Sequence, residues 1–248
     1  MKKLHPILLS LKFVIVTLLL SQSKEVSSLT IYTDYHQYPW VYSDNEGQPI
    51  KGISLELIEL ILKDSNIKYS IETLPWPRAL HLASNTTDTC IFPTARTESR
   101  ENIFHWIAHV GYNSLAFFAS ENSQITLKTL DDAKKYEIGI NISSIIYETL
   151  KKENFMNIKG ISDNNRMIQM LTNNRLDLIA LNKFEALYTA KRLNKTIIEK
   201  LEFGKSKLYL ACNKKTNPDY IKILNNNFEQ LLLSDKIKKV YTKYKITQ

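Results

Sequence analysis

Residues 75–106 read PWPRALHLASNTTDTCIFPTARTESRENIFHW, and this stretch decides the fold. A tryptophan between two prolines opens an apolar helical segment, and polar residues 85–88 then turn the chain into a short buried strand, residues 89–92. The strand runs into Thr94 and then into TESR, where a hydroxyl residue and an acid precede a basic residue. This order of strand, polar loop and helix start is typical of α/β proteins.

Two side chains in this stretch have the chemistry of a binding site. Backbone N–H groups at a helix start bind anions, and Arg100 lies in the first turn of the expected helix. A guanidinium is a forked, permanently charged donor that suits a carboxylate, and Trp76 would supply an aromatic wall. The alternative for each is structural: Trp76 packs in a core, and Arg100 is solvated and pairs with Glu98 or Glu101.

The N-terminus has the pattern of a secretory signal peptide, which we place at residues 1–23. Two lysines precede the apolar run LKFVIVTLLL and a polar segment, and the run is short for a membrane span. We therefore expect a periplasmic protein, with an uncleaved anchor as the alternative. The remaining chain is long enough for two lobes of roughly 100 residues each.

Composition narrows the classes of function. Without the predicted signal peptide the formal charge falls from +8 to +5, and the lysines are spread out without interleaved aromatics, so we expect no nucleic-acid partner. The sequence has no clustered metal-ligand spacing, and we expect no metal or other cofactor. Cys90 and Cys212 each lie in an apolar run; a disulfide and two buried thiols are both open.

Strands and helices alternate along the rest of the chain. A loop at residues 35–52 carries four aromatic residues, which either pack the loop down or form a stacking surface. A strand at residues 114–119 crosses between two bodies, and a strand at residues 208–212 returns. The other expected elements are strands at 29–34, 68–74, 137–140 and 173–181, and helices at 53–62, 145–152, 163–172 and 218–244.

With these pieces in place, the chain resembles the family 3 extracellular solute-binding proteins, the periplasmic receptors of polar amino acid ABC transporters. The segments that carry the resemblance are YPWVYSDNEGQPIKGISLELIELI (38–61), LPWPRAL (74–80), TESRENIFHW (97–106), IGINIS (138–143) and NRLDLIALN (174–182). The resemblance implies an α/β fold of the periplasmic binding protein-like type II, with two lobes, each with a mostly parallel sheet, joined by two crossover strands. Lobe I would comprise residues 24–114 and 206–248, and lobe II residues 115–205.

The resemblance also implies a set of ligand-binding residues. Arg100 matches the arginine that holds the ligand carboxylate, and Ser144 matches a hydroxyl that assists from the second lobe. Trp76 would stack on the ligand, and Asp34 would lie near its distal end. Asn182 occupies the position where the family usually has an aspartate that holds the ammonium group; Thr94 completes the predicted set.

The departures from the family pattern concern charge and shape. Asn182 is a neutral amide, which cannot offset the desolvation of a buried positive charge. Ordinary zwitterionic amino acids are therefore expected to bind weakly unless Asp34 or another acid supplies the charge. Phe92 and Pro93 replace small residues at the strand-to-loop junction, and Ser143 replaces the loop glycine.

The resulting expectation is a monomeric binding protein rather than an enzyme. It would close two lobes on a small carboxylate-bearing or amino-acid-like solute and present it to an ABC transporter permease. Two alternatives are a periplasmic enzyme of the same fold, similar to cyclohexadienyl dehydratase, and a ligand-binding sensor that acts in trans. The enzyme would need a positioned acid, and Asp34 is the one acid that the resemblance places in the cleft.

Overall fold

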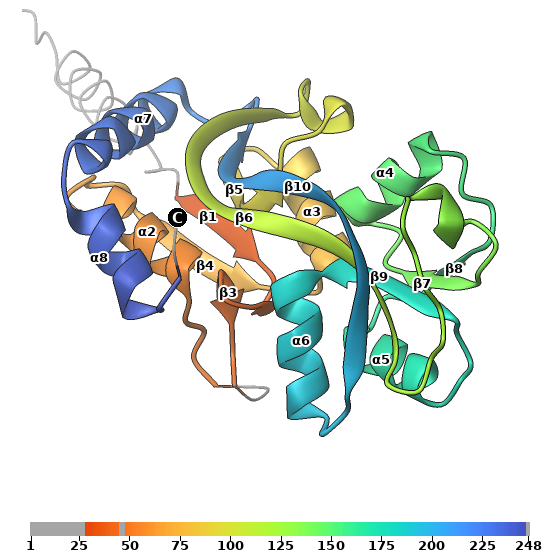
Figure 1. Cartoon of the computed structure of the whole chain (residues 1–248). Coiled ribbons are helices and arrows are strands. Elements are labelled where there is room, and N and C mark those ends of the chain that lie inside the picture. Colours follow the sequence, from red (N-terminus) through yellow and green to blue (C-terminus); the bar gives the residue numbers. More distant parts are fainter. Residues whose placement is uncertain (1–27, 45–47, 247–248) are drawn as a thin grey trace, which may run out of the picture.

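The computed structural model describes residues 28–44 and 48–246, and the predicted signal peptide lies outside these ranges. The described chain forms two α/β lobes joined by two long strands that run side by side (Figure 1). Eight of the described strands form one sheet in the order β4-β1-β5-β10-β6-β9-β7-β8. Within the described residues, no helix is long and apolar enough to cross a membrane.

Lobe I is built on a parallel sheet with helices on both faces. Its strands are β1 (Leu29–Thr33), β4 (Tyr69–Thr73) and β5 (Thr89–Ala95). Because side chains alternate along a strand, Leu29 and Ile31 pack with helices on one face and Tyr32 packs on the other. The first face carries α2 (Ile53–Leu62), α7 (Pro218–Leu232) and α8 (Lys236–Lys243), and the second carries α3 (Trp76–Asn85).

Lobe II repeats this layered arrangement with shorter strands. Its strands are β7 (Ile138–Ile140), β8 (Ile158–Gly160) and β9 (Leu178–Asn182), all parallel. Phe117 packs on one face of the sheet and Phe118 on the other. The two faces are covered by α4 (Ile145–Lys152) and by α5 (Asn164–Thr172) with α6 (Lys183–Arg192).

The two crossing strands are longer than the sequence indicates. The predicted segments at 114–119 and 208–212 are parts of β6 (Phe104–Ser120) and β10 (Ile197–Asn213), which pair antiparallel along nearly their whole length. These strands run through both lobes, and within the described chain they connect the strands of lobe I to those of lobe II in the one sheet. We retain residues 114–115 and 205–206 as the proposed points where the chain passes between lobes.

One predicted element is wrong. The expected helix after TESR is a single 3-10 turn, η1 (Glu98–Arg100), and the chain enters β6 four residues later. A turn this short has no row of free N–H groups to bind an anion. The position of Arg100 is therefore set by the connection between β5 and β6. A second 3-10 turn, η2 (Asp131–Ala133), lies between β6 and β7.

The aromatic loop serves both purposes that the sequence left open. Trp40 is 1% exposed and packs in the core of lobe I, and Tyr42 is also buried. Tyr38 instead stacks on Tyr188 of α6, with ring centroids 4.2 Å apart, so it contacts lobe II. The loop also forms the short hairpin of β2 (His36–Gln37) and β3 (Val41–Tyr42).

The two cysteines form a disulfide. Cys90 on β5 and Cys212 on β10 are directly opposite each other in the antiparallel ladder, and both are fully buried. The bond joins residues that are 122 positions apart in the sequence. It thereby ties the returning strand to the first part of lobe I.

Removing this disulfide is expected to destabilise the protein. A cross-link over so long a loop restricts the unfolded chain, and its loss should lower the free energy of unfolding by about 2–4 kcal/mol. Urea denaturation of the Cys90→Ala/Cys212→Ala double variant would measure the change. The parent in reductant should then unfold like the double variant, whereas equal midpoints for the oxidised parent and the variant would refute this role.

Candidate functional site

A cavity of about 570 Å³ lies between the two lobes. This volume is in the range of pockets that enclose small polar solutes. Five of the six predicted site residues line the cavity: Asp34, Trp76, Arg100, Ser144 and Asn182. Thr94 is fully buried behind the wall, where its Oγ1 accepts a hydrogen bond from Arg100 Nη1 at 3.1 Å. Thr94 therefore contacts Arg100 and does not line the cavity.

Arg100 is only 5% exposed, and residues of lobe I hold its side chain in place. Its Nη1 donates to Thr94 and, at 3.1 Å, to the carbonyl oxygen of Ala95. Burial lowers the pKa of the guanidinium, and the carboxylate of Glu148 opposes that shift. A hydroxyl oxygen and a carbonyl oxygen thus fix one nitrogen of the guanidinium and leave its other side for an anion.

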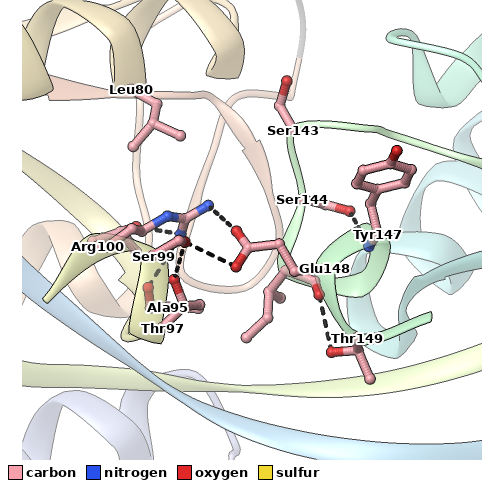
Figure 2. A network of polar contacts seen from close by, with 12 residues as sticks. Leu80, Ala95, Thr97, Ser99, Arg100, Ser143, Ser144, Tyr147, Glu148 and Thr149 are labelled. Atoms are coloured by element: carbon pink, nitrogen blue, oxygen red, sulfur yellow. Dashed lines mark hydrogen bonds and ion pairs between the residues drawn. The ribbon is translucent and has the colours of Figure 1, made fainter. Parts of the chain in front are cut away.

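The anion that Arg100 meets in this structure comes from the other lobe. Figure 2 shows Glu148, on the first turn of α4, reaching across to the η1 turn. Its Oε1 lies 3.5 Å from Arg100 Nη2, and its Oε2 accepts a hydrogen bond from Ser99 Oγ at 3.0 Å. Lys152, one turn further along α4, pairs with Glu98 at 3.1 Å. Acidic and basic side chains of α4 and η1 therefore pair across the boundary between the lobes. In this structure the two lobes are closed on each other.

Glu148 is expected to hold the lobes together when no solute is bound. Glu148→Gln removes a charge that partly compensates a buried guanidinium, which should disfavour the closed form by about 1–2 kcal/mol. Small-angle scattering of the solute-free protein would report the larger radius of gyration.

The matched control is Lys152→Gln, because the Lys152–Glu98 pair is exposed and exposed pairs contribute little. Indistinguishable scattering from the two variants would show that Glu148 is merely another surface charge.

Trp76 joins the two lobes through its indole. Its Nε1 donates to the carbonyl oxygen of Ser143 at 3.1 Å, and its ring lies 5.9 Å from Arg100 Cζ. The side chain is partly buried against α3 and β6 residues and also lines the cavity. The two alternatives for Trp76, core aromatic and cavity wall, are thus both partly correct.

Asp34 has a structural task at the end of β1. Its Oδ1 accepts from the His36 backbone N–H at 2.8 Å and lies 3.0 Å from His36 Nδ1. Its Oδ2 accepts from the Trp76 backbone N–H at 3.0 Å, which satisfies a free donor at the start of α3. Asp34 therefore fixes the relative positions of the β2 hairpin and Trp76, and its carboxylate still borders the cavity.

Ser144 and Asn182 both begin helices of lobe II. Ser144 Oγ accepts from the Tyr147 backbone N–H at 3.3 Å and caps α4. Asn182 Oδ1 accepts from the Phe184 backbone N–H at 3.2 Å and caps α6, while its Nδ2 donates to Asn113 Oδ1 on β6. Both ends of the Asn182 amide are thus engaged inside the protein, although the residue lines the cavity.

Sequence reasoning missed an acid in this cavity. Glu185 lies one turn after Asn182 on α6, half-buried on the cavity wall. Desolvation raises the pKa of its carboxyl to about 8, and the charge of Asp34 adds to the shift. Asn164, the first residue of α5, donates a hydrogen bond from its Nδ2 to Glu185 Oε1.

The spacing Asn182-Lys183-Phe184-Glu185 matches a helix-start pattern, which could have signalled α6.

The bulky junction residues differ in their effect. Pro93 lines the cavity as expected, but Phe92 is fully buried in the core of lobe I. Side chains alternate along β5, and Phe92 points to the face covered by α2. Only Pro93 therefore changes the shape of the wall.

Comparison with known proteins identifies relatives of this chain and of its fold. The L-cystine-binding protein TcyJ of Escherichia coli (strain K12) is 22% identical over 220 residues, which cover 86% of this chain and 80% of that protein. A histidine kinase sensor domain similar to periplasmic binding proteins has a TM-score of 0.77 at 12% identity, covering 87% of this chain and 95% of that one. The ancestral amino acid-binding protein AncCDT-1, a precursor of cyclohexadienyl dehydratase, has a TM-score of 0.71 at 17% identity, covering 87% and 94%.

The two structural likenesses show the fold alone, since proteins of such different function share it. The model of bacterial extracellular solute-binding proteins, family 3, matches residues 29–247, nearly the whole described chain. The two lobes, joined by two crossing strands around a cavity, agree with this match. The chain therefore belongs to the family 3 bacterial extracellular solute-binding proteins.

Proposed function

We propose that this protein captures a small carboxylate-bearing, amino-acid-like solute in the periplasm and presents it to an ABC transporter. The observation that carries the proposal is Arg100, a buried guanidinium fixed on the cavity wall with one side open to the cavity. A solute carboxylate there would form charge-assisted hydrogen bonds in a desolvated place. The distance of 3.5 Å from Arg100 to Glu148 is longer than such a bond, so a better-placed carboxylate can take the donor.

The relatives support the class of solute. TcyJ is named for binding L-cystine, and AncCDT-1 for binding amino acids. The buried disulfide also fits an oxidising compartment outside the cytoplasm. Closure would proceed by hinge motion about β6 and β10, and the exposed surfaces of the closed lobes would then meet the transporter.

The experiment is a binding screen with chemical recovery. The exported chain would be titrated calorimetrically with the twenty standard amino acids, L-cystine and the amine-free counterpart of each. We expect at least one carboxylate compound to bind with a micromolar or lower Kd and to be recovered unchanged by chromatography. If no compound with a carboxylate binds, the proposal is wrong.

A second candidate, an enzyme that uses a general acid, is favoured by Glu185. A general acid works best when its pKa lies near the working pH, and the pKa of Glu185 is about 8. An elimination of water from a hydroxy acid held by Arg100 would need such a donor. Recovery of a changed compound, with turnover lost in Glu185→Gln, would favour this candidate over solute capture.

A further inference from the structure

Three tyrosines join the two lobes outside the cavity. Tyr38, in the loop between β2 and β3, stacks on Tyr188 of α6, with ring centroids 4.2 Å apart and ring planes 1° apart. Tyr42 of β3 meets both rings edge-on, at 4.8 Å from Tyr38 and 5.5 Å from Tyr188. β3 of lobe I and α6 of lobe II therefore lie side by side (Figure 1). We call Tyr38, Tyr42 and Tyr188 the tyrosine clasp.

The hydroxyl of Tyr188 adds a polar contact to the clasp. Tyr188 Oη donates a hydrogen bond to Asp44 Oδ1 at 3.2 Å, and Lys51 Nζ pairs with Oδ2 of the same carboxylate. Lys51 and Tyr42 exchange two backbone hydrogen bonds, of 2.8 and 2.9 Å, which fix this part of lobe I. Burial, and then the hydrogen bond to Asp44, raise the pKa of Tyr188 to about 12, so its hydroxyl remains a donor at neutral pH.

A second aromatic side chain of α6 strengthens the same contact. Phe184 lies one turn before Tyr188 and therefore on the same face of the helix. Its ring meets the buried ring of Trp40 edge-on, at 6.4 Å. Lobe II is thus attached to lobe I through aromatic rings on α6 as well as through Glu148 on α4.

The clasp borders the cavity but does not line it. Gln37 and Thr189 line the cavity, whereas their sequence neighbours Tyr38 and Tyr188 do not. The contacts of the clasp are made between protein side chains alone, so they favour closure with or without a solute. A solute changes the balance between open and closed forms only through its own difference in affinity for the two.

We propose that the tyrosine clasp keeps the solute-free protein mostly closed, and that a solute enters and leaves only after Tyr188 has separated from Tyr38. Tyr188 then controls the rate of solute exchange, a role that goes beyond the proposed function. Because the closed cavity does not admit a solute, opening must precede binding.

Pulsed electron paramagnetic resonance of the solute-free protein tests this proposal. Spin labels would be placed at Met156→Cys in lobe II and Lys222→Cys in lobe I, which are both exposed positions, and the two native cysteines are already bonded to each other. We expect a single short distance in the labelled parent. Tyr188→Ala should add a longer distance and lower the ratio of closed to open protein at least tenfold, since it removes two ring contacts.

Three further variants separate the clasp from a general loss of packing. Tyr188→Phe keeps the ring and loses only the hydrogen bond to Asp44, so it should open much less than Tyr188→Ala. Tyr38→Ala removes the partner ring, should open the lobes as well, and serves as the second variant if Tyr188→Ala does not fold. The matched control is Tyr69→Ala, because Tyr69 is an exposed tyrosine on β4, at the far edge of the lobe I sheet, and should give the parent's distances.

Binding kinetics give a second readout. Stopped-flow tryptophan fluorescence would follow the standard amino acid, or L-cystine, that binds the parent most tightly. The observed rate for the parent should level off at high concentration, where opening becomes limiting, and this plateau should rise at least tenfold in Tyr188→Ala.

A parent that is mostly open without solute would overturn the proposal. So would parent-like distances in both Tyr188→Ala and Tyr38→Ala, an equally large opening in Tyr69→Ala, or an unchanged plateau rate in Tyr188→Ala. The distance measurement needs no solute, so failure of every compound to bind would count against the proposed function and leave this test intact.

Discussion

Replacing Arg100 with alanine is expected to weaken binding of the carboxylate solute by about 2–5 kcal/mol, a rise in Kd of roughly 30- to 5,000-fold. The loss is large because the guanidinium is buried, is held in place by Thr94 and Ala95, and lines the cavity beside the ring of Trp76. The probe is whichever standard amino acid, or L-cystine, binds the parent most tightly. Isothermal titration would give the change in Kd.

Two variants distinguish carboxylate binding by the Arg100 fork from a general effect of positive charge. Arg100→Lys keeps the charge but loses the fork, so it should bind with intermediate affinity. Arg96→Ala removes a neighbouring arginine that pairs with Glu101 on the surface, and it should bind like the parent. Binding by Arg100→Ala within threefold of the parent would mean that the carboxylate is held elsewhere.

The layers of the fold were predictable because they depend on local patterns. Helices α2 and α4 have the predicted bounds, since their apolar spacing and flanking residues are encoded within ten residues of sequence. The length of β6 was not predictable. In its early part, His105, His109 and Gly111 interrupt the aromatic and apolar residues, and pairing with β10 makes the whole segment one strand.

The sequence predicted which residues lie beside the cavity, but not the hydrogen bonds that they make. Five of the six predicted residues line the cavity, yet Asp34 and Asn182 accept hydrogen bonds from backbone N–H groups at the starts of helices. Short polar side chains after a strand have both uses, and the sequence alone does not rank them.

Glu148 and Glu185 show what sequence patterns cannot reveal. Each is an ordinary glutamate on a helix, and its importance comes from what another segment brings opposite it: Arg100 for Glu148, Asp34 and Asn164 for Glu185. Desolvation is a property of the assembled cavity, so a shifted pKa has no counterpart in local spacing.

The second large effect concerns the stability of the solute-free protein. The pKa of Glu185 is raised from 4.5 to about 8 in the folded state. Between these pH values the folded protein retains a proton that the unfolded chain has released, so the free energy of unfolding falls as pH rises. The slope is at most about 1.4 kcal/mol per pH unit, and the total loss reaches about 4 kcal/mol by pH 8. Well below pH 4.5, where both states are protonated, the residue contributes no slope.

Glu185→Gln keeps the shape of the protonated side chain and cannot ionise. Its stability relative to the parent should therefore be similar near pH 5 and greater by up to about 4 kcal/mol at pH 8.5, as measured by urea denaturation across this range. Glu199→Gln is the matched control: Glu199 pairs with Lys183 and does not line the cavity, so this variant should keep the slope of the parent. Parallel curves for the parent and Glu185→Gln would mean that solvent reaches Glu185 freely and that burial does not raise the pKa of its carboxyl.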